Sequence, residues 1–358
     1  MKSLLSKCFF LGMLLFVAAC TKSTKEEDTV PVPPKPAVDT SLQKFLPFKV
    51  GAAVNINLLK NNYRYSNLVA KEFNSLTAEN AMKFSALHPS ENTFSWSDAD
   101  YLVSFAQANN KRIHGHTLLW HQSVPSWVTN FQGDSAAWEA LVKTHIQTVV
   151  THFKGKVTSW DVVNEALEDN GTMRNSLWLQ KLGPDYIARC FQYAHEADPA
   201  ALLFYNDYGH EYSATKRTAI INLVTSLKNR GIPVHGIGMQ FHTRYTQPDA
   251  NLAAAINTAA ATGLQVHISE LDIAVNPENN PSLVFTPALK EQQASKYLFV
   301  VRTFNAITAN QKFGITTWNV TDADSWVPTH YNRPDWPLPF DANYARKPAY
   351  YSMIEGGK

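Results

Sequence analysis

Short apolar segments and stretches of helical pattern alternate from residue 45 to the end of the chain, and this alternation constrains the fold more than any other feature. Alternation of this kind favours a parallel sheet covered by helices. Eight strands are predicted, at residues 49–54, 74–77, 112–118, 157–163, 202–205, 236–240, 265–271 and 314–318. Eight strands alternating with helices over roughly 310 residues predict a single (β/α)8 TIM barrel. A doubly wound sheet is the alternative, but no GxGxxG or GxxxxGK sequence follows a predicted strand.

The helices between these strands carry recognisable start and stop signals. They are predicted at residues 98–109, 135–153, 184–195, 215–230, 252–262 and 287–309. Asp98 and Ser135 are expected to be N-caps, because their side chains can accept hydrogen bonds from the first turn. Pro184 is expected in the first helical turn, where its missing N–H costs no hydrogen bond. Gly231 and Gly263 suit the left-handed conformation that ends many helices.

The first 19 residues are typical of an export signal. Lys2 and Lys7 precede an uncharged apolar run at residues 8–19, which is shorter than the ~20 residues needed to span a bilayer. The run ends in small residues followed by Cys20, which resembles the bacterial lipobox. We therefore expect residues 1–19 to be a lipoprotein signal peptide and Cys20 to carry lipid. The alternative is an ordinary signal peptide with a cysteine at the cleavage point by chance.

Residues 20–44 are expected to form a flexible, lipid-anchored linker. The segment is polar and charged at first and then carries four prolines within residues 30–36. Such proline-rich sequence is stiff and extended and does not pack into a core. The catalytic domain is expected at residues 45–358. Together these assignments predict an exported lipoprotein, held at the outer membrane or the cell surface.

Charge and cysteine content exclude several classes of protein. The 32 Lys and Arg residues nearly balance the 30 Asp and Glu residues, which argues against a nucleic-acid partner. The three cysteines form no CxxC pair, which excludes a zinc ribbon and a thioredoxin-type site. If Cys20 is lipidated after cleavage, Cys190 is the thiol that remains and forms no internal disulfide. We interpret Cys190 as a small apolar residue on a helix.

Two glutamates end predicted strands on opposite sides of the barrel. Glu165 ends the fourth strand and Glu270 the seventh. Active residues of such barrels lie at the carboxyl ends of the strands, and glycoside hydrolysis needs two carboxyl groups beside the scissile bond. A single strand-end glutamate is weak support, because it could equally be a surface or ion-paired residue. The pair of glutamates at the ends of the fourth and seventh strands is far more specific to glycoside hydrolysis.

Neighbouring residues suggest how the two glutamates differ. Residues two apart on a strand share a face, so Glu270 and Asp272 are expected to point together. We expect His242 to lie between them, donating to Glu270 and held in place by Asp272. This arrangement would keep Glu270 ionised and suits a nucleophile. Asn164 is expected to bind the sugar 2-hydroxyl, and the faces of Trp318 and Trp326 to receive sugar rings.

The chain resembles the glycoside hydrolase family 10 endo-β-1,4-xylanases from about residue 45 onward. The matching segments are residues 74–83 (NSLTAENAMK), 115–121 (GHTLLWH), 160–166 (WDVVNEA), 205–208 (YNDY), 236–242 (GIGMQFH) and 266–272 (VHISELD), with Trp318 and residues 322–326 (DADSW). Any one of these segments alone would give moderate support for the resemblance. All of them together, in this order, are very specific to the family. The resemblance implies a retaining, double-displacement enzyme that acts on xylan without metal or cofactor.

The same resemblance implies a role for individual residues. Glu165 would be the acid/base and Glu270 the nucleophile. Contacts on the glycone side would come from Glu79, Asn80, Lys83, His116, Trp120 and Gln240. Trp318 and Trp326 would be platforms, and Tyr208 would stack on the leaving-group side.

Two positions in the last loop depart from the family pattern. Asn319 stands where glycine is usual, and Val327 where a basic residue is common. These changes put the shape of this loop and the tolerance for branched substrates in question, whereas the chemistry is unaffected. Glu211 is also unusual, and the sequence suggests no role for it.

Several other functions are compatible with parts of the sequence. His114 and His116 form an HxH pair like that of metal-dependent amidohydrolase barrels, but no matching metal ligands follow at later strand ends. A non-catalytic glycan-binding lipoprotein would not need both Glu165 and Glu270. A retaining β-1,4-glucanase or mannanase is the nearest alternative. The resemblance implies that Glu79 and Lys83 would crowd the exocyclic hydroxymethyl of such sugars, which favours xylan.

Overall fold

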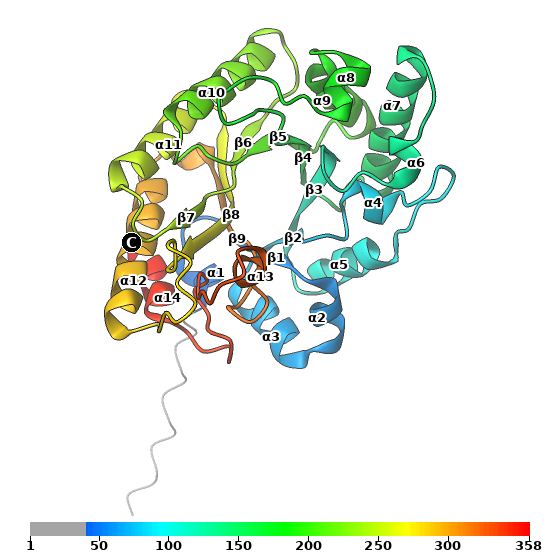
Figure 1. Cartoon of the computed structure of the whole chain (residues 1–358). Helices are drawn as coiled ribbons and strands as arrows, with labels where there is room; N and C mark the ends of the chain where they lie inside the picture. Colours follow the sequence, from blue (N-terminus) through cyan, green and yellow to red (C-terminus); the bar gives the residue numbers. More distant parts are fainter. Residues whose placement is uncertain (1–40) are drawn as a thin grey trace, which may run out of the picture. The chain divides into compact units, whose positions relative to one another are not determined.

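The computed structural model describes residues 41–358, which form a closed ring of parallel strands surrounded by helices (Figure 1). Strand β1 pairs with β2 on one side and with β9 on the other, and β6 pairs with β8, so the ring has no free edge. The staves of the ring are β1 Val50–Val54, β2 Ser75–Ala78, β3 Arg112–Trp120, β4 Ser159–Asn164, β5 Leu202–Asp207, β6 Gly236–Met239, β8 Gln265–Ala274 and β9 Lys312–Thr317. The predicted (β/α)8 barrel is confirmed.

A short additional strand, β7 His242–Arg244, follows β6 and pairs with the far end of β8. This pairing sets His242 opposite Asp272 in the register. The sequence predicted no separate strand here. The pairing extends the barrel wall beyond the carboxyl end of β6, beside the last residues of β8 up to Ala274.

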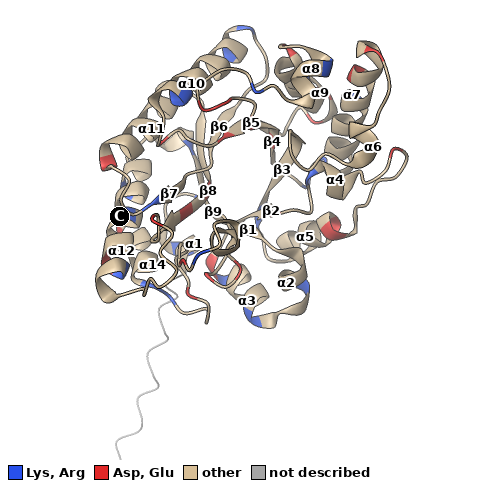
Figure 2. Ribbon diagram, viewed as in Figure 1, with Lys and Arg blue, Asp and Glu red and all other residues tan. Residues whose placement is uncertain are grey.

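Helices connect the strands, and the longer ones form the outer layer of the barrel (Figure 1). They are α1 Leu42–Phe45, α2 Ile56–Asn61, α3 Tyr63–Glu72, α4 Phe84–Leu87, α5 Ser97–Ala108, α6 Ser126–Thr129, α7 Ser135–His152, α8 Leu177–Leu182, α9 Tyr186–Ala197, α10 Ala214–Asn229, α11 Asp249–Ala261, α12 Pro287–Asn305, the 3-10 turn η1 Ala309–Gln311, α13 Trp326–His330 and α14 Pro348–Gly356. Acidic and basic residues are interspersed over these helices (Figure 2).

Three predicted helix starts are wrong by one or two residues. Helix α7 is capped by Asp134, whose side chain accepts a 2.9 Å hydrogen bond from the Ala137 N–H, and Ser135 is the first helical residue. Helix α5 begins at Ser97, so Asp98 lies inside its first turn. Pro184 precedes α9, which begins at Tyr186. At α7 the adjacent Asp134 and Ser135 can both cap the helix, and the sequence pattern does not decide between neighbours. Helices α5 and α9 begin without a side-chain cap hydrogen bond, so a capping signal could not locate their starts.

The predicted helix ends are closer to the structure. Gly231 and Gly263 have φ angles of 71° and 75°, in the left-handed region expected of them. The long helix α12 ends at Asn305, four residues before its predicted end, and η1 follows it. Cys190 is buried on α9, and burial raises the pKa of its thiol, as an unreactive core residue requires.

Glycines on two strands leave room for aromatic rings from the neighbouring strands. A Cβ atom on Gly115 of β3 would lie 2.1 Å from the ring of Trp160 on β4. Gly236 of β6 faces Phe204 of β5 in the same way, at 2.0 Å. Because no side chain fits in these gaps, glycine is required where an aromatic ring from the neighbouring strand lies over the backbone.

The folded domain begins earlier than predicted. The linker was expected to extend to residue 44, but Ser41 and Leu42 are buried, and Leu42 begins helix α1. The N–H of Leu42 donates to the buried carboxylate of Glu72 at 3.0 Å. Glu72 also accepts from Tyr350 and Arg346 near the other end of the chain. The predicted linker boundary is therefore wrong, because residues 41–44 pack on the barrel.

The predicted signal peptide, Cys20 and most of the predicted linker lie outside the described residues. Within residues 41–358, no helix has both the length and the apolar character that crossing a bilayer demands.

Candidate active site

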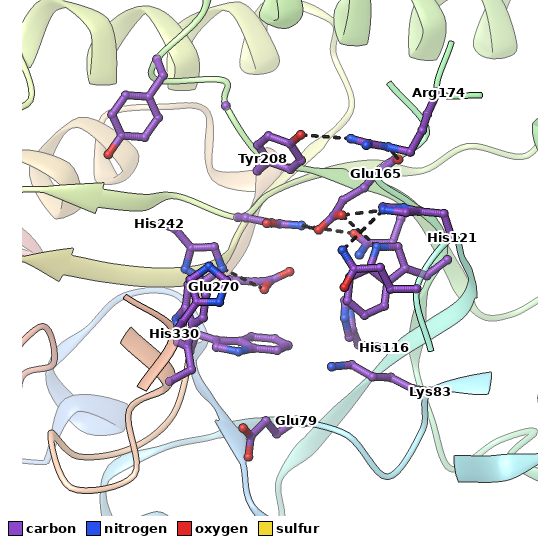
Figure 3. Close-up of a pocket in the computed structure, with 18 of the residues that line it drawn as sticks. Glu79, Lys83, His116, His121, Glu165, Arg174, Tyr208, His242, Glu270 and His330 are labelled. Atoms are coloured by element: carbon purple, nitrogen blue, oxygen red, sulfur yellow. Dashed lines mark hydrogen bonds and ion pairs between the residues drawn. The ribbon is translucent and has the colours of Figure 1, made fainter. Parts of the chain in front are cut away.

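The carboxyl ends of the strands surround a cavity of about 590 Å³ (Figure 3). Twelve of the residues predicted from the sequence line it: Glu79, Lys83, His116, Trp120, Asn164, Glu165, Tyr208, Gln240, His242, Glu270, Trp318 and Trp326. Asp272 lies behind His242 and lines a neighbouring pocket. Asn80 is exposed outside the cavity wall and accepts a 2.9 Å hydrogen bond from Lys83. The structure therefore brings together nearly all of the predicted site.

Glu270 lies on β8 and is held by donors on both of its oxygens. His242 Nε2 lies 3.2 Å from Oε2, and Asn206 Nδ2 donates to Oε1 at 2.8 Å. Burial on its own raises the pKa of Glu270, but the hydrogen bond from His242 and the charge of His116 lower it below the ordinary value. Glu270 is therefore ionised, although it is almost fully buried.

His242 bridges Glu270 and Asp272, as the strand pattern predicted. Its Nδ1 lies 2.7 Å from Asp272 Oδ2, and Trp326 Nε1 donates to the same oxygen at 2.8 Å. Burial opposes the charged imidazolium, but the charge and hydrogen bond of Asp272, together with those of Glu270, raise the pKa of His242 to about 10. The site thus contains a charged histidine between two carboxylates near neutral pH.

Glu165 has a different set of partners, as Figure 3 shows. Trp120 Nε1 donates to Oε2 at 2.8 Å, and Gln240 Nε2 donates to Oε1 at 2.8 Å. His121 Nδ1 lies 3.9 Å from Oε2, and burial lowers the pKa of this histidine. The carboxyl group is thus held by neutral donors, without a charged residue in direct hydrogen-bond contact with it.

The backbone at Glu165 is strained. Its φ angle is 57°, a left-handed conformation that costs of order 1–3 kcal/mol for a residue other than glycine. The Arg174 side chain donates to the Glu165 carbonyl at 2.9 Å, and the Glu165 N–H donates to the Asn206 carbonyl at 2.9 Å. These contacts hold the turn that directs the side chain into the cavity after β4.

Asn206 at the end of β5 connects the surroundings of the two glutamates. Its side-chain amide contacts Glu270, and it lies 2.9 Å from the amide of Asn164, which precedes Glu165. Ser269 Oγ donates to Asn206 Oδ1 at 2.7 Å. The sequence placed Asn206 at a strand end but did not suggest this linking role.

Glu79 and Lys83 lie together at one end of the cavity, opposite Tyr208 and Arg174 (Figure 3). Burial raises the pKa of Glu79 and lowers that of Lys83, although nearby glutamates oppose the shift of the lysine. Lys83 Nζ lies 5.1 Å from the centre of the Trp120 ring. This end of the cavity can donate to and accept from sugar hydroxyls while two indole rings flank it.

The two histidines of the HxH pair both face Asp161 on β4. His114 Nε2 lies 3.0 Å from Oδ1, and His116 Nδ1 lies 2.9 Å from Oδ2. Burial raises the pKa of Asp161, but the two histidines outweigh it and lower the pKa well below its usual range. Among residues 41–358, no group of three or more His, Cys, Asp and Glu side chains is arranged to hold a metal ion.

The backbone explains why asparagine is tolerated at position 319. Asn319 has a φ angle of 77°, in the left-handed region that glycine adopts freely and asparagine tolerates better than most residues. Its Oδ1 accepts a 3.1 Å hydrogen bond from the Trp326 N–H. The asparagine therefore keeps the turn and holds Trp326 at the cavity. Val327, the other departure, is buried against the neighbouring pocket.

Some residues of the cavity were missed because they lie on loops. Arg174, Tyr212 and Tyr331 line it, and both tyrosines are exposed by more than 40%. No strand pattern marks such residues, although Tyr212 lies only four residues after the 205–208 segment, and this proximity is a signal that could have pointed to it. Glu211 also lines the cavity, and burial raises its pKa to about 7.

The fold and the paired glutamates define this chain as a barrel glycoside hydrolase. More narrowly, residues 39–356 match the family model described as glycosyl hydrolase family 10, so the chain belongs to that family.

Relatives and solved structures agree with this assignment. The chain is 40% identical over 326 residues to the endo-1,4-beta-xylanase A of Thermoanaerobacterium saccharolyticum and to the exoglucanase XynX of Acetivibrio thermocellus. Each match covers 87% of this chain but only 27% and 29% of those proteins, so the chain spans less than a third of their length. Xylanase 10B of Thermotoga petrophila, solved in complex with xylobiose, is 36% identical with a TM-score of 0.83, over 88% of this chain and 97% of that one.

Proposed function

We propose that this protein is an endo-β-1,4-xylanase that cleaves xylan with retention of configuration. The observation that carries the proposal is the unequal treatment of two glutamates in one cavity. Glu270 is held ionised by His242 and Asn206, whereas Glu165 is held by the neutral donors Trp120 and Gln240. A retaining glycosidase needs one carboxylate that attacks and one carboxyl group that transfers a proton.

In the first step, a Glu270 oxygen attacks the anomeric carbon while the Glu165 carboxyl group donates its proton to the departing glycosidic oxygen. A glycosyl ester on Glu270 forms as the bond to the leaving group breaks. In the second step, Glu165 takes a proton from water, whose oxygen attacks the same carbon and releases Glu270 as a carboxylate. His242 stays protonated throughout and orients Glu270.

The xylan substrate is proposed from the end of the cavity where Glu79 and Lys83 lie. By the family resemblance, these two side chains would crowd an exocyclic hydroxymethyl group, and a xylose ring has no such group. The xylanase among the relatives and the structure that contains xylobiose support the same choice. The relative named exoglucanase makes a β-1,4-glucanase the second candidate.

Trapping with a 2-fluoro-xylobioside that carries a good leaving group tests the proposal. We expect a stable adduct whose mass maps to Glu270 in the peptide digest. Hydrolysis of linear xylohexaose, cellohexaose and mannohexaose under the same conditions separates the candidate substrates. Label on another residue would refute the assignment of the nucleophile, and faster hydrolysis of cellohexaose would favour the glucanase.

We further propose that the protein is exported and anchored to the outer membrane or the cell surface by lipid on Cys20. The lipobox-like sequence before Cys20 and the polar, proline-rich segment after it support this localisation. Growth of expressing bacteria with radiolabelled palmitate should label the wild-type chain and leave Cys20→Ser unlabelled. Equal label in both chains, or none in either, would refute lipidation at this residue.

A further inference from the structure

A second cavity of about 350 Å³ adjoins the catalytic cavity, and we call it the side pocket. Its walls include Tyr212, His242, Arg244, Trp326, Tyr331 and Arg333. Four of these, Tyr212, His242, Trp326 and Tyr331, also line the catalytic cavity. A group attached to a sugar beside Glu270 could therefore reach the side pocket past His242 and Trp326.

The charges of the side pocket are mainly positive. Arg244 ends β7, and no carboxylate within residues 41–358 lies at ion-pair distance from its guanidinium. Arg333 comes from the loop after α13 and pairs with Asp335 at 3.1 Å. Among residues 41–358, Asp272 is the carboxylate that lines the side pocket. One of its oxygens, Oδ2, already accepts hydrogen bonds from His242 and Trp326. Arg244 is thus left with its charge uncompensated.

The catalytic cavity carries charges of both signs, with Lys83, Arg174 and the charged His242 beside its glutamates. Four glutamates, Glu79, Glu165, Glu211 and Glu270, line it. An anionic substituent on the substrate would meet these carboxylates there, whereas in the side pocket it would meet the unpaired guanidinium of Arg244. Val327, which stands where the family commonly has a basic residue, brings no charge to this wall. Arg244 at the end of β7 therefore supplies the uncompensated positive charge of this wall.

The side pocket also offers surfaces that suit a sugar ring. The Arg244 guanidinium lies 5.5 Å from the centre of the Tyr212 ring, and the Arg333 guanidinium lies 4.5 Å from that of Tyr331. Both tyrosines are partly exposed. Its volume falls in the range of about 300–1,000 Å³ found for small-molecule sites. Aromatic faces beside a guanidinium fork provide stacking for a pyranose and paired donors for a carboxylate.

We propose that the side pocket binds a uronic acid branch of the xylan chain and that Arg244 recognises its carboxylate. The inference rests on the proposed xylanase function. It specifies which substituted substrates the enzyme prefers: uronate-bearing xylan over xylan whose branches are neutral.

The test compares kcat/KM for a uronate-branched xylo-oligosaccharide with that for the linear oligosaccharide of equal backbone length. We expect Arg244→Gln to lower the branched-to-linear ratio about tenfold, the effect of losing one charge-assisted hydrogen bond. Arg244→Lys should lower it less. Arg302→Gln, which removes an exposed arginine outside both cavities, is the matched control and should leave the ratio unchanged.

A second arm uses the same branched substrate after its carboxyl group has been reduced to a hydroxymethyl group. Reduction should abolish the wild-type preference and should have no further effect on Arg244→Gln. An unchanged ratio in Arg244→Gln, or a preference that survives reduction, would overturn the inference. Binding of both oligosaccharides to Glu270→Gln, measured by calorimetry, tests the side pocket independently of turnover. A wild-type enzyme that cleaves neither substrate would refute the proposed function instead.

Discussion

The regions around Glu165 and Glu270 face the same cavity, yet they treat a glutamate in opposite ways. Around Glu270, a charged histidine and an asparagine donate to both carboxylate oxygens. Around Glu165, an indole and an amide donate, and the neighbouring His121 has its pKa lowered by burial. The difference shows that the partners, not the residue type, assign the nucleophile and the proton donor. Substitutions in each region should therefore have distinct kinetic signatures.

The largest effect is expected for Glu270→Gln. Turnover of xylohexaose should fall by at least about 10⁴-fold, because the amide cannot form the glycosyl ester. Steady-state kinetics measures the loss, and calorimetry with xylohexaose serves as the control, since binding should persist. Substantial residual turnover in Glu270→Gln, in protein free of wild-type enzyme, would contradict the role of this residue.

Glu165→Ala should slow hydrolysis by about 10²–10⁴-fold through loss of proton transfer. With an aryl xylobioside whose leaving group needs no proton, the glycosyl-enzyme should still form. Added azide should then restore turnover and yield a β-glycosyl azide, detectable by NMR. The same azide addition to Glu270→Gln should not restore this product. Failure of azide to accelerate Glu165→Ala would count against the acid/base assignment.

His242→Asn should lower kcat/KM by about 10²-fold and change the pH profile. The hydrogen bond and charge of His242 lower the pKa of Glu270, so their removal raises that pKa. Glu270 then becomes protonated at a higher pH, and the acid limb of the kcat/KM profile should shift upward. Rates measured across the acid range test this shift. A profile that falls in height without moving would mean that His242 serves packing alone.

Trp120→Phe should have the smallest effect, about tenfold in kcat, because it removes one neutral donor from Glu165 and keeps an aromatic ring. The acid limb should stay in place, since the partners of Glu270 are untouched. Comparison of this profile with that of His242→Asn separates the two regions directly. A shift of the acid limb in Trp120→Phe would show that the two glutamates titrate as one unit.

The sequence predicted the parts of the site that follow from strand geometry. The twofold period of a strand set Glu270 and Asp272 on one face, and His242 lies between them as expected. Loop residues such as Arg174 and Tyr331 were not predicted, because their positions depend on how long segments fold over the barrel mouth. The link through Asn206 was also missed, since it requires the distance between side chains on two strands.

Local signals had a similar limit in the outer layer. The chain has Asp134 directly before Ser135, and either could cap α7, but only the structure shows that Asp134 accepts the hydrogen bond. The predicted linker ended at residue 44 because nothing in the sequence marks residues 41–44 as part of a core. Leu42 is buried by contacts with helices distant in the sequence.

The carboxylate of Glu72 links helix α1 at the start of the barrel to Arg346 and Tyr350 near its end. It accepts from the Leu42 N–H, from Arg346 and from the Tyr350 hydroxyl, so residues about 300 positions apart share one anchor. Trimming the protein past Leu42 for crystallisation would strip a donor from a charge that has no access to water. A circularly permuted variant, by contrast, could join the two parts through a short peptide and open new termini on the opposite side of the barrel.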